Sequence, residues 1–295
     1  MRIAIGFLLL AAALLPCAAQ THGLSYQQPE QIMEQGANIS AAEAQALEAQ
    51  LEKIPHDLIA RTKLLGYYYY AWMQPGEEAA RAARRKHILW LIENHPESPI
   101  LNLAEVAIED RGNSLADPEG YHQARQLWLS QMESRKDQVQ VLGNAARFFQ
   151  MTDKNLTESI LLRAQALQPY NKEWDWRLGY LYGMGILGVD ALGLNGQPTS
   201  VDPILAAGPF AAKSRQALAA TKSGTTLAMA AQILWRYGTM LSTSGDQKLT
   251  WLDQAIQLIE QARAAEPNNP SWPQYLRQLR ESQKEAVTPA PKLGK

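Results

Sequence analysis

Apolar residues recur every three or four positions along most of this chain, and this spacing predicts amphipathic helices. Between residues 41 and 54 the apolar stripe consists of Ala44, Leu47, Leu51 and Ile54. Ser40 and Glu43 stand at the start of this stretch, spaced as in the capping box of a helix N-terminus. By the same reading we expect helices over residues 41–54, 58–72, 77–94, 99–109, 118–133, 138–151, 156–167, 172–184, 209–221, 225–242, 249–265 and 273–286.

Helix-forming residues dominate the chain after residue 40, and runs of β-branched residues are almost absent. Short helices joined by short turns predict an all-α fold, an α-solenoid of about 10–12 helices in antiparallel pairs. We expect the solenoid to cover residues 41–286, after an N-terminal linker at 20–40 and before a disordered tail at 287–295. A long inserted loop at 188–208 is expected to lie over the solenoid face.

A repeat runs through the middle of the chain. Equivalent residues stand 34 positions apart, namely Ala145 with Gly179 and Phe148 with Tyr182. The spacing Leu-Gly-x-x-Tyr begins at Leu178 and again at Leu65. These motifs resemble the tetratricopeptide repeat; residues 138–171 fit its scheme without insertion, and the other units are degenerate. The shorter-looped Sel1-like repeats are a related alternative. The resemblance implies that Gly179 lets a neighbouring helix pack closely.

Aromatic residues are the main candidates for a binding surface. In the family that the chain resembles, the first helix of each pair lines a concave groove. The repeat phase directs six aromatic side chains toward that groove: Tyr67, Tyr70, Phe149, Trp176, Tyr180 and Trp235. The same phase places Tyr69 in the core. The alternative is that these rings fill core space between imperfect repeats, which is the common place of aromatics at helical spacing.

Charge and motif content argue against several classes of function. The chain has 28 Lys and Arg against 29 Asp and Glu, so it offers no basic field for nucleic acid. No metalloprotease, nucleophile-elbow or P-loop motif occurs. The histidines, which show no zinc-site spacing, are His22, His56, His87, His95 and His122. We therefore expect no enzyme activity, no cofactor and no metal.

Two further segments have weak chemical signals. Residues 183–188 read literally as G-x-G-x-x-G, but a helix precedes them, whereas a dinucleotide site needs a strand there. We interpret them as a helix end loosened by glycines. Asp190, Asn195 and Asp202 of the inserted loop carry oxygen atoms that could bind a cation, but their spacing matches no calcium loop.

These observations favour a scaffold that holds a protein or peptide partner in an aromatic-lined groove. One alternative is a carbohydrate-binding or glycoside-processing helical-repeat protein of the cell envelope, which requires aromatic residues and carboxylates in one pocket. A second alternative is a structural protein of the cell envelope that is anchored in the membrane by its own N-terminal signal sequence. Partner binding requires only an open groove.

The N-terminus has the pattern of a secretory signal peptide. Arg2 precedes an apolar run at residues 3–15, and small residues follow, so we expect a signal at 1–19 and an exported protein, periplasmic or secreted. The run is short for a membrane span. Membrane attachment would need an uncleaved signal or lipidation at Cys17, which the preceding Pro16 disfavours.

We predict that the mature chain begins near Gln20, because the small residues before it suit signal peptidase. N-terminal sequencing of exported protein checks this. Mature material that still carried Met1 would show that the signal is not cleaved.

Overall fold

The computed structural model describes residues 27–72, 78–111, 116–189, 191–192 and 197–287, and within these ranges every regular element is a helix. Extended pairing there is limited to two isolated β-bridges, Glu109 with Ala116 and Leu192 with Pro198. The prediction of an all-α protein is confirmed. The expected signal, most of the expected tail and part of the inserted loop lie outside the described residues.

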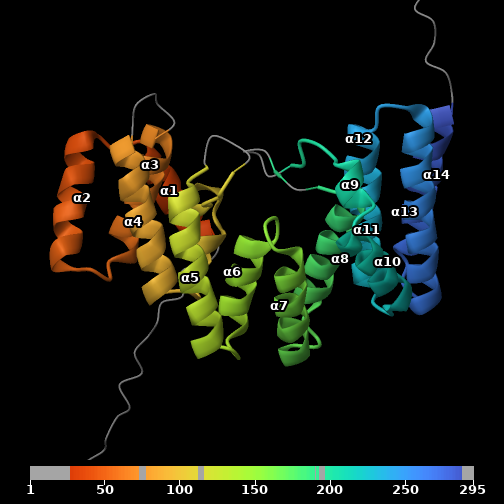
Figure 1. Cartoon of the computed structure of the whole chain (residues 1–295), viewed down its shortest axis with the longest axis horizontal. Helices are drawn as coiled ribbons and strands as arrows, with labels where there is room; N and C mark the ends of the chain where they lie inside the picture. Colours follow the sequence, from red (N-terminus) through yellow and green to blue (C-terminus); the bar gives the residue numbers. More distant parts are fainter. Residues whose placement is uncertain (1–26, 73–77, 112–115, 190, 193–196, 288–295) are drawn as a thin grey trace, which may run out of the picture.

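The helices follow one another along the long axis of the molecule, from α2 at one end to α14 at the other (Figure 1). In chain order they are α1 (Gln27–Ala37), α2 (Ala41–Lys53), α3 (Leu58–Trp72), α4 (Glu78–Asn94), the 3-10 turns η1 (Pro99–Asn102) and η2 (Ala104–Val106), α5 (Pro118–Ser134), α6 (Val139–Phe149), α7 (Lys154–Leu167), α8 (Lys172–Leu187), α9 (Pro203–Ala206), α10 (Pro209–Ala220), α11 (Gly224–Ile233), the π-helical segment η3 (Leu234–Gly238), α12 (Thr239–Leu241), α13 (Gly245–Ala265) and α14 (Trp272–Val287).

One buried apolar core runs from Met33 in α1 to Leu279 in α14, and a smaller cluster lies between α2 and α3. The long helices other than α2 contribute residues to the main core; most pack on a neighbour in the chain, whereas α1 packs on α3 and α11 on α8. None of the described helices combines the length and the apolar character needed to cross a membrane.

The predicted helix at 99–109 is wrong, because the structure has two 3-10 turns there. Its buried apolar residues are Ile100, Leu103, Val106 and Ile108. The first three stand three positions apart, which matches the three residues per turn of a 3-10 helix. The carbonyls of Glu105 and Ala107 accept hydrogen bonds from the buried guanidinium of Arg84, which satisfies backbone groups that an α-helix would have paired internally.

The expected linker at 20–40 also needs correction, since its residues 27–37 form α1. This helix crosses α3 in direct backbone contact. A Cβ atom at Gly66 would overlap the carbonyl of Met33, and one at Gly36 would overlap the carbonyl of Lys63. The glycine of the first Leu-Gly-x-x-Tyr motif therefore accommodates a helix that the sequence reading had missed.

Glycines play the same part along α8. A Cβ atom at Gly179 would overlap the carbonyl of Thr226, and one at Gly183 would lie 2.7 Å from the Cβ of Ile233, both belonging to α11. At Gly185 an added Cβ would lie 2.7 Å from the ring of Phe210 in α10. The close-packing role expected of Gly179 is confirmed, with α11 as the partner.

The helix predicted to end at Met184 runs on to Leu187, and Gly188 closes it. Gly188 has φ 75°, a left-handed conformation that glycine adopts at low cost. The G-x-G-x-x-G run is thus the packed end of a helix. The single helix predicted for 225–242 is interrupted by the π-helical segment η3, whose Gly238 faces Trp251.

We predict that Gly179→Ala lowers the free energy of unfolding by about 1–3 kcal/mol, because α8 and α11 must separate to admit the methyl group. Chemical denaturation measures the change. The matched control is Gly245→Ala in α13, where the added Cβ meets nothing closer than 3.9 Å. Equal stability of the two variants would contradict the close contact at Gly179.

Candidate functional site

A pocket of about 250 Å³ lies between α6, α7 and α8. Its lining combines aliphatic, aromatic and cationic side chains, namely Ala146, Arg147, Gln150, Thr157, Leu161, Trp176, Arg177, Tyr180, Leu181 and Leu192. Trp176 and Tyr180 are two of the six aromatic residues expected at a binding surface. The structure therefore brings two of the predicted residues together in a concave site.

Trp176 and Tyr180 form an aromatic platform on α8. They stand four positions apart, so their side chains fall on the same face of the helix. Their rings are stacked, with centroids 5.9 Å apart and planes inclined by 20°. Trp176 is 47% exposed, whereas Tyr180 is half-buried beneath it. A large apolar ring is thus held in a defined orientation at the pocket surface.

The charged side chains of the pocket lining are guanidinium groups. Arg147 comes from α6 and Arg177 from α8, and Arg177 lies 3.6 Å from the carboxylate of Glu173 outside the lining. Burial raises the pKa of Tyr180 to about 12; the nearby Tyr237 adds to this rise and Arg147 opposes it. The Tyr180 hydroxyl is therefore protonated at neutral pH and can donate a hydrogen bond to a ligand.

Phe149 is a correction, because the structure buries it completely (0% exposed) instead of exposing it in a groove. Its ring packs edge-on against Phe148, with centroids 4.9 Å apart. The residues of α6 that line the pocket are Ala146 and Arg147, and Gln150, directly after the helix, joins them. These three share a helix face that Phe149 does not, so the predicted rotation of α6 was wrong by about one residue.

The remaining predicted residues lie elsewhere. Tyr67 and Tyr70 belong to α3, well separated from α8 along the molecule (Figure 1). Tyr67 is half-buried, whereas Tyr70 is 44% exposed. Trp235 belongs to the π-helical segment and packs against the core. Tyr69 is buried, as expected. Sequence reasoning missed Arg147, Gln150 and Arg177, although the correct phase of α6 would have pointed to the first two.

A second polar centre joins α2, α3 and α4 around His87, which is fully buried. The Nη1 of Arg61 lies 2.9 Å from Nδ1 of His87, and because a guanidinium only donates, this nitrogen accepts. The proton is therefore on Nε2, which donates to Glu48 over 2.8 Å. The hydroxyl of Tyr68 also donates to Glu48 over 3.0 Å.

In this centre the neutral imidazole of His87 lies between the positive guanidinium of Arg61 and the negative carboxylate of Glu48. The hydrogen bond from His87 is the main cause that lowers the pKa of Glu48 to about 2. Burial lowers the pKa of His87 and outweighs the opposite effect of Glu48. A histidine beside a carboxylate is also part of hydrolytic triads, but here Arg61 occupies the nitrogen that would accept a proton. We conclude that His87 ties the three helices together.

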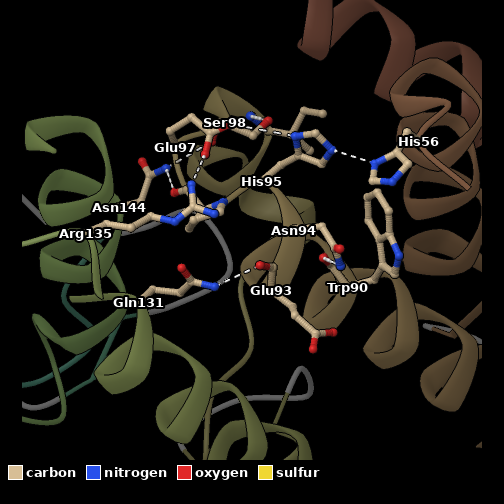
Figure 2. A network of polar contacts seen from close by, with 12 residues as sticks. His56, Trp90, Glu93, Asn94, His95, Glu97, Ser98, Gln131, Arg135 and Asn144 are labelled. Carbon is tan, nitrogen blue, oxygen red and sulfur yellow. Dashed lines mark hydrogen bonds and ion pairs between the residues drawn. The ribbon is translucent and has the colours of Figure 1, made fainter. Parts of the chain in front are cut away.

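A third polar cluster lies at the C-terminal end of α4 (Figure 2). Asn144 of α6 donates to the carbonyls of Pro96 and Ser98, over 2.8 and 3.0 Å, and accepts from Asn102 over 2.8 Å. Asn144 is buried, so these bonds fix the turn after α4 against α6. On the outer side of the same turn, His95 meets His56 from the turn after α2.

The acidic and histidine side chains form no cluster of metal ligands in the described residues. In the described part of the chain, no group of three or more His, Cys, Asp or Glu side chains is arranged to hold a metal ion. Asp202 caps α9 by accepting from the backbone N–H of Ile204 over 2.8 Å. Asp190 and Asn195, the other candidates of the inserted loop, lie outside the described residues.

Comparison of the chain with protein-family models, with curated proteins and with solved structures finds no match. The function must therefore be inferred from the geometry and chemistry of the sites themselves.

We predict that Glu48→Gln destabilises the protein at pH 7 by about 1–2 kcal/mol. A fall of the pKa of Glu48 from 4.5 to about 2 corresponds to a larger stabilisation than this. The carboxylate is partly exposed, however, and screening by solvent reduces its contribution to the free energy of unfolding. Because the folded-state pKa is depressed, this stabilisation is present above pH 4.5 and is lost as the pH falls toward 2.

Urea unfolding at pH 6 and at pH 3 measures this effect. The difference between the wild type and Glu48→Gln should shrink at the lower pH. Protonation of His87 below about pH 6.5 destabilises both proteins, because its pKa is also lowered on folding. Glu52→Gln, on an exposed residue of the same helix, is the control. If both variants behaved alike, the proposed role of Glu48 would be wrong.

Proposed function

We propose that the protein binds a partner protein or peptide in the pocket between α6, α7 and α8, with Trp176 as the anchor and Tyr180 as its support. The observation that supports this most is a tryptophan that is 47% exposed and stacked in a defined orientation over a concave surface. Tryptophan and tyrosine are the residues most enriched at the energetic centres of protein interfaces.

The chemistry of the lining suggests what the bound segment offers. An apolar side chain would cover the indole of Trp176 and contact the aliphatic wall that Leu161 and Leu181 provide. Hydrogen-bond acceptors on the same segment would meet the guanidinium groups of Arg147 and Arg177 and the hydroxyl of Tyr180. This combination suits an extended peptide segment.

We also propose that the helices form a solenoid of antiparallel pairs similar to tetratricopeptide repeats. The 34-residue spacing of Ala145 and Gly179 supports this proposal, as does the continuous core between neighbouring helices. The proposed setting is extracytoplasmic, on the strength of the signal-like N-terminus. In this proposal the protein acts as a scaffold and not as an enzyme.

Carbohydrate binding is the second candidate, because a stacked Trp–Tyr platform also fits the apolar face of a sugar ring. Hydrolysis of a glycoside at this pocket is disfavoured, since it needs a pair of carboxylic side chains and the described lining contains none. The carbohydrate alternative is therefore limited to binding.

We predict that Trp176→Ala weakens partner binding by about 1–4 kcal/mol and leaves the melting temperature nearly unchanged, because the ring is largely at the surface. Pull-down from envelope extract with mass spectrometry would identify the partner, and calorimetry with the purified partner would measure the affinity. A panel of soluble oligosaccharides tests the carbohydrate alternative with the same variant.

The matched control is Tyr170→Ala, since Tyr170 is 96% exposed just before α8 but does not line the pocket. It should bind like the wild type. Phe149→Ala should instead lose about 3–5 kcal/mol of stability, as a core residue does. Unchanged capture by Trp176→Ala, or its unfolding, would refute the proposed site.

A further inference from the structure

Two histidines from distant parts of the chain meet on the surface between the turn after α2 and the end of α4 (Figure 2). The Nδ1 atom of His56 and the Nε2 atom of His95 are 3.3 Å apart, although 39 positions separate the residues. His56 is exposed, and the side chain of His95 is one quarter exposed. From this pair we propose a binding site for a divalent transition-metal ion, with both imidazoles as ligands.

The distance between the two nitrogens suits a shared ion. Bonds from imidazole nitrogen to zinc are about 2.0–2.1 Å long, and two such bonds at a tetrahedral angle place the nitrogens roughly 3.3 Å apart. Without an ion, one ring donates a hydrogen bond to the other across the observed 3.3 Å; an ion would replace this shared proton at nearly the same nitrogen–nitrogen distance, so the backbone need not move. Within the described part of the chain two imidazoles converge here, so water or a group from a partner would occupy the remaining positions of the ion.

Glu97 prepares His95 for this role. Its carboxylate lies 3.7 Å from Nδ1 of His95, and its other oxygen lies 3.4 Å from the guanidinium of Arg135 (Figure 2). A proton on Nδ1 of His95, the nitrogen nearer this carboxylate, makes Nε2 the acceptor of the hydrogen bond from His56 and leaves its lone pair for an ion once that proton is displaced. Metal-binding histidines commonly have such a carboxylate at the nitrogen that does not bind the ion. The exposed His56 can carry its own proton on Nε2, which leaves Nδ1 to bind.

Trp90 forms the wall of the site and holds both rings. Its centroid lies 5.3 Å from that of His56 and 5.4 Å from that of His95. Arg61 lies against the same indole, 3.5 Å from its centroid, and is engaged with His87. This nearby positive charge disfavours hard cations, which rely on electrostatic attraction. The site should therefore select ions with strong bonds to imidazole, Cu²⁺ and Zn²⁺ over Mg²⁺ and Ca²⁺.

A bound ion would clip the turn after α2 to the end of α4. Because the two histidines converge only in the folded chain, the ion binds the native state and stabilises it. This inference is independent of the aromatic pocket on α8 and does not rest on the proposed function.

The experiment uses the untagged protein and the metal ions alone. Calorimetric titration with Zn²⁺ should show one ion bound per chain, and electron paramagnetic resonance with Cu²⁺ should show nitrogen ligands. His56→Gln and His95→Gln should each weaken binding at least ten-fold. The matched control is His122→Gln, which removes an exposed histidine of α5 and should leave binding unchanged. Mg²⁺ should not bind.

Thermal melting separates loss of the site from loss of the fold. Zn²⁺ should raise the melting temperature of the wild type and of His122→Gln, but not that of His56→Gln, whose exposed side chain is not needed for folding. Glu97→Gln should weaken binding about ten-fold, because it releases the proton at Nδ1 of His95. If the wild type binds no Zn²⁺ or Cu²⁺, or if His56→Gln binds like the wild type, the proposal is wrong.

Discussion

The close approach of helices at glycines is the constraint on which the arrangement of this protein depends. Gly179 and Gly183 let α11 lie close against α8. Gly185 lets the ring of Phe210 in α10 pack on the same helix, and Gly66 lets α1 cross α3. In each case a side chain larger than hydrogen would force the helices apart. The position of α8 follows from these contacts, and with it the direction in which Trp176 and Tyr180 point.

Buried polar groups join the N-terminal helices in a different way. Glu48, His87 and Arg61 form a chain of hydrogen bonds across α2, α3 and α4, in which each group satisfies the next. The cation of Arg61 then lies against Trp90, which in turn contacts His56 and His95. Arg61 and Trp90 thus link the buried network to the surface histidines, and the geometry of the histidine pair depends on that network.

The two candidate sites use different chemistry and lie in different parts of the chain. The pocket on α8 presents an indole and guanidinium groups, which favour a peptide segment or another ligand with an apolar face and hydrogen-bond acceptors. The histidine pair presents two imidazole nitrogens that share one hydrogen bond and that would suit a transition-metal ion in place of the shared proton. A scaffold that bound its partner at one site and was stiffened by an ion at the other would use both, yet each proposal can be tested without the other.

Several features of this protein were determined by the sequence alone, because they depend on residues close together in the chain. The helical class follows from the apolar spacing, the capping box of Ser40 and Glu43 occurs as predicted, and the stacking of Trp176 on Tyr180 follows from their four-residue separation. Tertiary structure decided the rest. Phe149 is buried because the rotation of α6 is set by its neighbours, and α1 was missed because its helix is stabilised by the crossing at Gly66. His56 and His95 are separated by 39 positions, and only the packing of α2, α3 and α4 brings their rings together, since no local spacing encodes a contact at that distance along the chain.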